Sequence, residues 1–336
     1  MIISKDASLL GFNTFGIDVK TSLFVEYNTV DELKAVLTSE MVSGKRMLHV
    51  GSGSNLLFLS DFDGVILHSG MRTINLIEET DEHVFIEAGS GVVWDDFVAY
   101  TVENGWGGAE NLSLIPGEVG ASAVQNIGAY GVEVKDLIAK VKTIEISTSS
   151  ERIFSNDECR YGYRQSIFKQ EFKGKYIVTS VIYKLDKDPV YQLGYQHLED
   201  EVRKNGDVSL KNIRETIIAV RESKLPDPKI LGNAGSFFMN PVVPKQQFLE
   251  LQSEYPTIPH YFVSESEEKI PAAWFIDQCN WKGKQLGHVG VHDKQPLVLV
   301  NKGGATGQEV VHLAEEIQKS VKKRFGIELY PEVNYI

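Results

Sequence analysis

The chain contains little cysteine. Only two cysteines, Cys159 and Cys279, occur among its 336 residues, and neither belongs to a CxxC pair. Two thiols this far apart favour neither a disulfide framework nor a zinc site. We therefore expect both to be buried as small apolar side chains in a reducing cytoplasm.

Long apolar runs and an excess of cations are also missing. No apolar run reaches the roughly 18 residues of a membrane-spanning helix, and the N-terminal stretch MIISKDASLL lacks the basic and apolar regions of a secretory signal. The formal charge of -12 argues against nucleic acid or an anionic membrane as partner. An anionic small substrate remains compatible, because local cations and helix N-termini can outweigh a negative net charge.

What is present is typical of a soluble globular protein, with 42% apolar and 24% charged residues. A chain of 336 residues is long enough for two or three domains, each with its own core. We expect a mixed α/β protein, because segments with helical and with strand periodicity alternate along the chain.

Several helices and strands carry local signals. We expect one helix to begin after the N-cap Thr29 and another near Ser209. Four further helices are predicted over residues 92–104, 244–254, 272–279 and 306–325. The helix over 306–325 has a capping box, formed by Thr306 and Glu309, and ends at Gly326. The predicted strands are RMLHV, GVILHS, HVFIEAG, KVKTIEIS, YIVTSVIYKL and PLVLVN. Seven glycines between Gly105 and Gly131 favour irregular backbone there.

Two glycine-rich loops are candidates for binding phosphate. HVGSGSN, His49 to Asn55, follows a predicted strand and offers backbone N–H groups that can converge on an anion. IPGEVGASAVQNIGAYG, Ile115 to Gly131, is a second such loop, and the two together could hold a pyrophosphate. The alternative is a strand-to-strand turn and a surface loop without a ligand.

The stretch GNAGSFFMNP places one hydroxyl, Ser236, between Gly235 and two phenylalanines. A tight turn that leads into a buried strand would explain this pattern without any chemistry. The catalytic alternative requires partners elsewhere in the chain.

Five motifs in a fixed order supply those partners. These motifs are GSGSN, IPGEVGASAVQNIGAYG, CRYGYRQSIFK, LPDPKILGNAGSFFMNP and YPEV, and the resemblance that they carry covers the chain from about Asn13 to Glu332. In this order they resemble the UDP-N-acetylenolpyruvoylglucosamine reductases of peptidoglycan synthesis. Tyr195 in QLGYQHL resembles the class of that family with an extra tyrosine-bearing loop.

The resemblance implies a fold and a reaction. The fold would be an FAD-binding region of the vanillyl-alcohol-oxidase type with two subdomains, followed by a C-terminal α+β substrate-binding domain, with boundaries at 1–70 (plus the strand 327–336), 71–225 and 226–326. The protein would be a cytoplasmic monomer that binds FAD non-covalently and uses NADPH to reduce UDP-N-acetylglucosamine enolpyruvate to UDP-N-acetylmuramate.

The resemblance also implies the residues of the site. Ser236 would donate a proton to the substrate carbanion, while Arg164 and Glu332 would act on its carboxylate. The implied FAD contacts are Gly51, Ser52, Gly53, Ser54, Asn55, Leu56, Pro116, Gly117, Gly120, Ala121, Ser122, Asn126, Ile127 and Gly128. The implied substrate contacts are Tyr130, Tyr163, Tyr195, Lys224, Asn240 and Gln295.

Some alternatives and departures remain. Lys224 could be a solvated helix end, Tyr195 a loop anchor and Gln295 a turn residue. Met239 stands where relatives commonly carry lysine, and the chain end after Glu332 could fray unless VNYI pairs as a strand.

His288 and His292 are four residues apart, but the glycine and valines between them favour a strand, so we expect no metal site. One alternative is another flavoprotein of this fold that oxidises an alcohol or a hydroxy acid, and the set of Ser236, Arg164 and Glu332 argues against it. A second is a nucleotide-binding module in which the same loops hold a ligand without catalysis.

Overall fold

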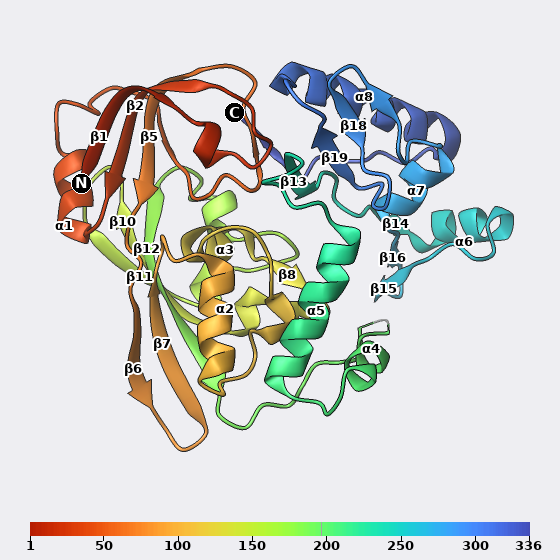
Figure 1. The fold of residues 1–336 in the computed structure, drawn as a ribbon, viewed down its shortest axis with the longest axis horizontal. Helices are drawn as coiled ribbons and strands as arrows, with labels where there is room; N and C mark the ends of the chain where they lie inside the picture. Colours follow the sequence, from red (N-terminus) through yellow and green to blue (C-terminus); the bar gives the residue numbers. More distant parts are fainter. Residues whose placement is uncertain (196) are drawn as a thin grey trace. The chain divides into compact units, whose positions relative to one another are not determined.

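The computed structural model describes residues 1–195 and 197–336 (Figure 1). The chain divides into two compact units. The first unit comprises Met1–Ala7, Thr21–Ser52 and Asp63–Ser223, and the second comprises Ser8–Lys20, Gly53–Phe62 and Lys224–Ile336. Each unit is assembled from segments far apart in the sequence.

The first unit contains a four-stranded sheet near the N-terminus. Its strand order is β1 (Ile2–Ser8), β2 (Lys20–Tyr27), β5 (Phe62–Ser69), β3 (Met47–His49). The following helix α1 (Val30–Leu37) begins where the sequence predicts, because the Thr29 hydroxyl accepts a hydrogen bond from the Glu32 N–H at 3.1 Å. Leu33 and Val36 of this helix are buried in a cluster with side chains of β2 and β5.

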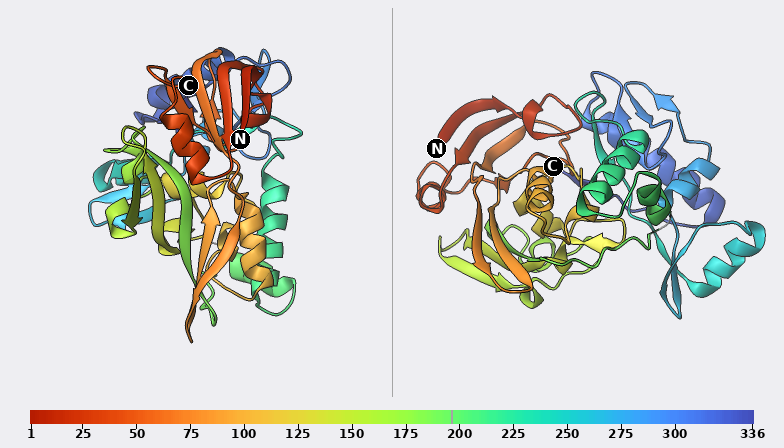
Figure 2. Two further views of the ribbon diagram at one scale, coloured as in Figure 1. Left: turned by 90° about the vertical axis from the view of Figure 1, so that its left-hand side faces the viewer. Right: turned by 60° about the horizontal axis from the view of Figure 1, so that its bottom comes forward.

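An antiparallel five-stranded sheet is the largest element of the first unit. Its order is β11 (Glu151–Ser155), β10 (Ile138–Glu145), β12 (Tyr176–Asp186), β7 (His83–Gly89), β6 (Ile74–Glu79). Helices α2 (Trp94–Glu103) and α5 (Leu210–Lys224) lie on the same side of this sheet in Figure 1 and in both views of Figure 2. The short helix α4 (Leu198–Lys204) precedes α5.

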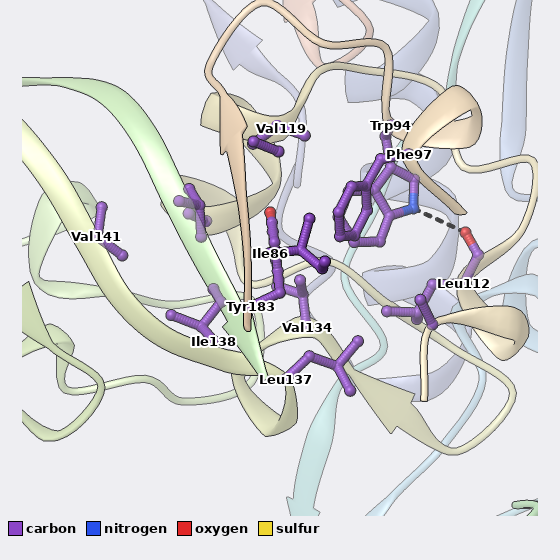
Figure 3. Packing of buried hydrophobic residues seen from close by; sticks show 14 of the residues in the cluster. Ile86, Trp94, Phe97, Leu112, Val119, Val134, Leu137, Ile138, Val141 and Tyr183 are labelled. Atoms are coloured by element: carbon purple, nitrogen blue, oxygen red, sulfur yellow. Dashed lines mark hydrogen bonds between the residues drawn. The ribbon is translucent and has the colours of Figure 1, made fainter. Parts of the chain in front are cut away.

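The main core of the first unit lies between this sheet and α2 (Figure 3). Trp94, Phe97 and Tyr183 form an aromatic group in which the Phe97 and Tyr183 ring centroids are 4.5 Å apart. The buried Trp94 indole donates its Nε1–H to the Leu112 carbonyl at 2.9 Å, so burial leaves no polar atom of this side chain unsatisfied.

The second unit contains two further sheets. The first has the order β13 (Asn233–Ser236), β19 (Val298–Asn301), β18 (Val289–Val291), β17 (Gln285–Leu286), and α8 (Gly307–Phe325) packs on it. The second consists of β14 (Val242–Pro244), β16 (Glu267–Lys269) and β15 (Tyr261–Ser264), with α6 (Lys245–Glu254) beside it; α7 (Ala272–Gln278) packs on α8. A parallel pair joins β20 (Asn334–Tyr335) to β4 (Leu56–Leu57).

Local signals placed α8 correctly. The Thr306 hydroxyl accepts from the Glu309 N–H, the Glu309 carboxylate accepts from the Thr306 N–H at 2.8 Å, and Gly326 has φ +67°. These features confirm the predicted capping box and the left-handed end of the helix. The predicted helices at 92–104, near 209, 244–254 and 272–279 and the six predicted strands are likewise confirmed, with ends shifted by a few residues.

Two expectations were wrong in part. The glycine-rich stretch 105–131 is not irregular throughout, because α3 (Val119–Gln125) and the strand pair β8 (Gly128–Ala129) and β9 (Val132–Glu133) lie in or next to it. Only one glycine falls inside α3, so its other residues can form a helical turn. Cys159 is buried as expected, but Cys279 is only partly buried.

No helix among the described residues is long and apolar enough to cross a membrane.

Candidate active site

The first glycine-rich loop begins directly after β3. The Val50 N–H donates to the Leu67 carbonyl of β5 at 2.8 Å, which holds the start of the loop against the four-stranded sheet. A Cβ at Gly51 would lie 2.9 Å from the Glu118 carboxylate oxygen, so Gly51 and the second loop are in close contact within the first unit. The backbone at Gly51 can be approached closely only because it carries no side chain.

The second loop is tied to the five-stranded sheet and the start of α2. The Trp94 N–H donates to the Gly117 carbonyl at 3.0 Å, and the Gly120 N–H donates to the Ser90 carbonyl at 2.9 Å. A Cβ at Gly120 would lie 2.8 Å from the Ser90 Cβ, so glycine is required there. The two predicted phosphate loops therefore meet within one unit.

This meeting point fits the diphosphate of FAD. The Ser52 hydroxyl is buried and has no hydrogen-bond partner among the described residues. A buried hydroxyl without a partner is unusual unless a ligand supplies one. Together with the close approach at Gly51, Ser52 makes this part of the first loop suitable for a phosphate oxygen.

Some predicted cofactor residues have structural partners in the second loop. The Asn126 amide donates to the Glu133 carboxylate at 3.1 Å and to the Gly162 carbonyl at 2.8 Å, and its oxygen accepts from the Lys135 N–H. The Ser122 hydroxyl donates to the Val119 carbonyl at 2.7 Å. These side chains hold the shape of the loop.

Arg164 is held by backbone carbonyls of the same loop. Its Nη2 donates to the Gly128 carbonyl at 2.9 Å and its Nη1 to the Asn126 carbonyl at 3.4 Å. The residue itself has φ +56°, an uncommon conformation for a side chain of this size. The Tyr163 ring lies 5.7 Å from the guanidinium carbon. The guanidinium plane is therefore oriented by the loop.

Tyr130 and Tyr195 lie together in the first unit. Their ring centroids are 5.8 Å apart in an edge-to-face arrangement. The Asn111 amide joins the two segments by donating to the Tyr130 carbonyl at 2.9 Å and to the Gln192 carbonyl at 2.7 Å. The predicted tyrosine-bearing loop is thus attached to the end of the second glycine-rich loop.

The sequence analysis missed Arg221 of α5. Its Nε is buried with no hydrogen-bond partner among the described residues, and its charge interacts with Tyr130, Asp95 and Arg164. Burial lowers the pKa of this guanidinium, although an arginine stays charged. Arg214, which pairs with Asp95 at 2.7 Å, precedes it by two helical turns on the same face. The seven-residue spacing of Arg214 and Arg221, which places both on one face of the predicted helix, was the signal in the sequence that could have identified Arg221.

Ser236 is the last residue of β13 in the second unit and is exposed to solvent. The ladder between β13 and β19 is irregular between Asn233 and Ser236, and Gly235 has φ +67° within this irregularity. The Asn233 side chain supports it by accepting from the Gly235 N–H at 2.9 Å. The next residue, Phe237, is buried. The bulge therefore directs the serine outward.

Glu332 lies on a segment that pairs with the residues after Ser236. The Glu332 N–H donates to the Phe237 carbonyl at 2.8 Å, and the Met239 N–H donates to the Tyr330 carbonyl at 2.9 Å. The Asn55 amide donates to the Glu332 carbonyl at 3.3 Å. The tail does not fray, because β20 continues this pairing against β4.

The other predicted substrate residues of the second unit have local contacts. The Asn240 oxygen accepts from the Ala272 N–H at 2.9 Å at the start of α7. Gln295 lies in the turn between β18 and β19, where its carbonyl accepts from the Val298 N–H at 3.0 Å. Lys224 is an exposed residue at the end of α5.

His288 and His292 do not form a site of their own. His288 Nδ1 lies 2.9 Å from Glu309, and His292 Nδ1 accepts from the Gln295 N–H at 3.2 Å. Among the residues the structure describes, no group of three or more His, Cys, Asp or Glu side chains could hold a metal ion.

The predicted site residues thus fall into two groups. Within the first unit the structure brings together the second loop, Arg164, Tyr130 and Tyr195, and places Gly51 against the same loop. Within the second unit it brings together Asn55, the segment around Ser236, and Glu332.

Comparison with known proteins identifies two families along the chain. Residues 21–150 match the family described as "FAD binding domain", and residues 227–336 match "UDP-N-acetylenolpyruvoylglucosamine reductase, C-terminal domain". The UDP-N-acetylenolpyruvoylglucosamine reductase of Bacteroides fragilis is 54% identical over 329 residues, which cover 98% of each chain. That of Porphyromonas gingivalis is 48% identical over 337 residues, which cover 100% of each chain.

A solved structure supports the fold. The UDP-N-acetylenolpyruvylglucosamine reductase of Thermus caldophilus superposes with a TM-score of 0.70 at 20% identity, covering 99% of this chain and 98% of the other. The predicted fold class, an FAD-binding region followed by a C-terminal α+β domain, is confirmed. Identities near one half over the whole length leave no room for another assignment: this chain belongs to the UDP-N-acetylenolpyruvoylglucosamine reductase family.

Proposed function

We propose that this chain reduces UDP-N-acetylglucosamine enolpyruvate to UDP-N-acetylmuramate, with NADPH as the reductant and non-covalent FAD as the cofactor. The family assignment supports this reaction. The observation that carries it is the pairing of Glu332 with the segment after Ser236, beside Asn55. This pairing brings the segment of the proposed proton donor, the proposed catalytic glutamate and Asn55 together within one unit.

Residues of both loops would hold FAD. In the first loop, the N–H groups around Gly51 and the Ser52 hydroxyl offer donors to the diphosphate, and in the second loop Gly120 lets the backbone pack closely against Ser90. When bound, FAD supplies the transfer of a hydride from NADPH to the terminal enol carbon of the substrate.

Ser236 would donate the proton that completes the reduction. Hydride addition leaves negative charge on the substrate carbon next to the carboxylate, and a carbanion of this kind is basic enough to take a proton from an alcohol held in place. Ser236 is exposed on a bulge whose backbone is held by Asn233. This combination of accessibility and a fixed backbone suits a proton donor.

Arg164 and Glu332 would act on the substrate carboxylate. The Arg164 guanidinium has its plane set by two carbonyls of the second loop, and such a plane can bind a carboxylate with parallel hydrogen bonds. A second carboxylate repels the first, so Glu332 would act in its protonated form, through Arg164, or through water.

The UDP portion would contact residues from several elements. We propose Tyr195, Lys224, Asn240 and Gln295 as its contacts, with Tyr130 and Tyr163 beside them. Arg221 adds a partly buried cation whose charge interacts with Tyr130, which favours an anionic ligand in this region.

We place the reaction in the synthesis of peptidoglycan precursors in the cytoplasm, and so in cell-wall formation, cell shape and division. The proposed form is a monomer of three domains, 1–70 with 327–336, 71–225 and 226–326, without a membrane or nucleic-acid partner. The net charge of -12 supports the last point.

Stopped-flow spectroscopy of the wild-type protein tests the proposal. The purified protein should be yellow, should lose its flavin absorbance on mixing with NADPH without oxygen, and should regain it on addition of the enolpyruvyl substrate. A flavin that an alcohol reduces but NADPH does not would indicate an alcohol-oxidising flavoprotein, and a flavin that neither reduces would indicate a module without catalysis.

A further inference from the structure

Glu118 is a buried carboxyl group that the proposed reaction does not use. It lies in the second loop between Gly117 and Val119, and only 7% of its surface is exposed. Its oxygen lies 2.9 Å from where a Cβ of Gly51 would be, so it occupies the contact between the two phosphate loops. The sequence shows only an acidic residue in a glycine-rich loop, which gives no sign of this burial.

The groups around Glu118 provide no close ion pair. His68 of β5 has its Nε2 4.0 Å from the Glu118 carboxylate, and Arg72 after β5 acts at longer range. From β2, Glu26 and Tyr27 face the same region, and the Glu26 carboxylate lies 3.6 Å from His68 Nε2. His49 of β3 bonds the Tyr27 hydroxyl at 2.8 Å.

These surroundings favour neutral groups near pH 7. Burial raises the pKa of Glu118 to about 8; Arg72 lowers it and Glu26 raises it further. Burial lowers the pKa of His68 and lowers that of His49 to about 3. A buried group without a strong partner gives up its charge, so Glu118 holds a proton and both imidazoles are neutral.

A neutral Glu118 matters because of what the neighbouring loops are proposed to bind. A diphosphate held by the N–H groups around Gly51 and by the Ser52 hydroxyl would lie beside this carboxyl group. An ionised carboxylate there would repel the phosphates in a region where water screens charge poorly. A protonated carboxyl group does not repel them and can itself donate a hydrogen bond.

We propose that Glu118 couples FAD binding to a proton, so that this protein holds the FAD diphosphate tightly only while the Glu118 carboxyl group is protonated. The inference rests on the proposed contacts between FAD and the two loops. It makes Glu118 a positioning residue for the cofactor, without a role in the transfer of the hydride or of the substrate proton.

The test measures the dissociation constant of FAD from the apoprotein by flavin fluorescence between about pH 6 and about pH 10. In the wild type the constant should be flat at low pH and should rise about tenfold per pH unit once Glu118 ionises in the free protein. In Glu118→Gln, which keeps the shape without the titration, the constant should stay flat. The matched control is Glu110→Gln, because Glu110 is 3% exposed in the same unit, and burial raises its pKa too; it should keep the wild-type rise.

A second measurement, made on the wild type, tests the inference even if the Glu118→Gln variant does not fold. Calorimetry of FAD binding to the wild type, in two buffers of different ionisation enthalpy, should show uptake of close to one proton at about pH 9 and almost none at about pH 6. A constant that does not rise with pH in the wild type, a rise retained in Glu118→Gln, or no proton uptake at high pH would each overturn the inference while FAD binding and the proposed function stand. A wild-type protein that binds no FAD at any pH would overturn both.

Discussion

Two buried carboxyl groups, one in each unit, have pKa values shifted in opposite directions. Glu268 of the second unit is 2% exposed and lies 2.5 Å from Lys245 Nζ and 3.0 Å from His260 Nδ1. Hydrogen bonds to Lys245 and His260 lower its pKa. Glu118 of the first unit is 7% exposed, its ion-pair partner among the described residues is His68 at 4.0 Å, and burial raises its pKa to about 8.

The difference shows that partners, more than burial, decide whether a buried carboxyl group carries charge. Glu268 has its partners within the protein and serves to join α6 to β16. Glu118 lacks such partners and lies where a ligand is proposed to bind. The comparison thus separates polar groups that hold the fold from polar groups that serve a ligand.

The largest expected effect comes from Ser236→Ala, because Ser236 is the proposed proton donor. General acids contribute about 10²–10⁴-fold to rate, so reoxidation of the reduced flavin by the enolpyruvyl substrate should slow by that factor. Flavin reduction by NADPH and the urea midpoint should not change, because Ser236 is exposed. Stopped-flow absorbance measures both half-reactions. Ser253→Ala, an exposed serine of α6, is the control; an unchanged second half-reaction in Ser236→Ala would remove the serine from the mechanism.

Trp94→Ala should have the largest effect on stability. Trp94 is 1% exposed, and loss of so large a core side chain commonly costs about 3–5 kcal/mol. The Leu112 carbonyl also loses its indole partner. Urea denaturation followed by circular dichroism measures the change. Val190→Ala, at a side chain 83% exposed, should stay within about 0.5 kcal/mol, and equal losses in the two variants would contradict the packing shown in Figure 3.

Lys245→Met tests the comparison directly, because it takes from Glu268 its nearest cation. In the wild type, the charged Glu268 carboxylate stabilises the fold at pH values above the ordinary carboxyl pKa. This stabilisation is lost as the pH falls through the lowered pKa of Glu268. The variant should be less stable at neutral pH and should lose less stability on acidification. Urea midpoints across the acid range measure this, with Lys319→Met, which removes an exposed lysine paired with Glu316, as the control. A pH dependence equal to that of the wild type would show that Lys245 does not set the charge of Glu268.

Thr306→Ala should have the smallest effect. It removes the N-cap of α8, which commonly costs about 1 kcal/mol. Thr306→Ser keeps the hydroxyl and should lose only a small part of this. Thermal denaturation compares the two variants, and equal stability of Thr306→Ala and the wild type would show that Glu309 alone satisfies the first turn of the helix.

Local signals determined much of the fold. The capping box and Gly326 predicted the limits of α8, and Thr29 predicted the start of α1, because caps depend on residues within one helical turn. The number of glycines led to the wrong prediction of irregular backbone where α3 lies. Gly120 is required by its close contact with Ser90 and lies within a helix.

The candidate site was predicted in part. The motif order pointed to Arg164, Ser236 and Glu332, and their roles remain proposals. Arg221 was missed because helical spacing alone does not show which charged side chains become buried. Glu118 was missed for the same reason, since its exposure depends on β2, β5 and the loop after β3.

The sequence by itself determined the family, the loops and the helix ends, because each motif and each helix cap consists of residues that are close together in the sequence. Only the tertiary structure decided that Glu332 pairs beside Ser236 and that Glu118 lies buried against Gly51. Hydrogen bonds and burial between distant segments follow from how the whole chain packs, and a carboxyl group takes its charge state from those neighbours.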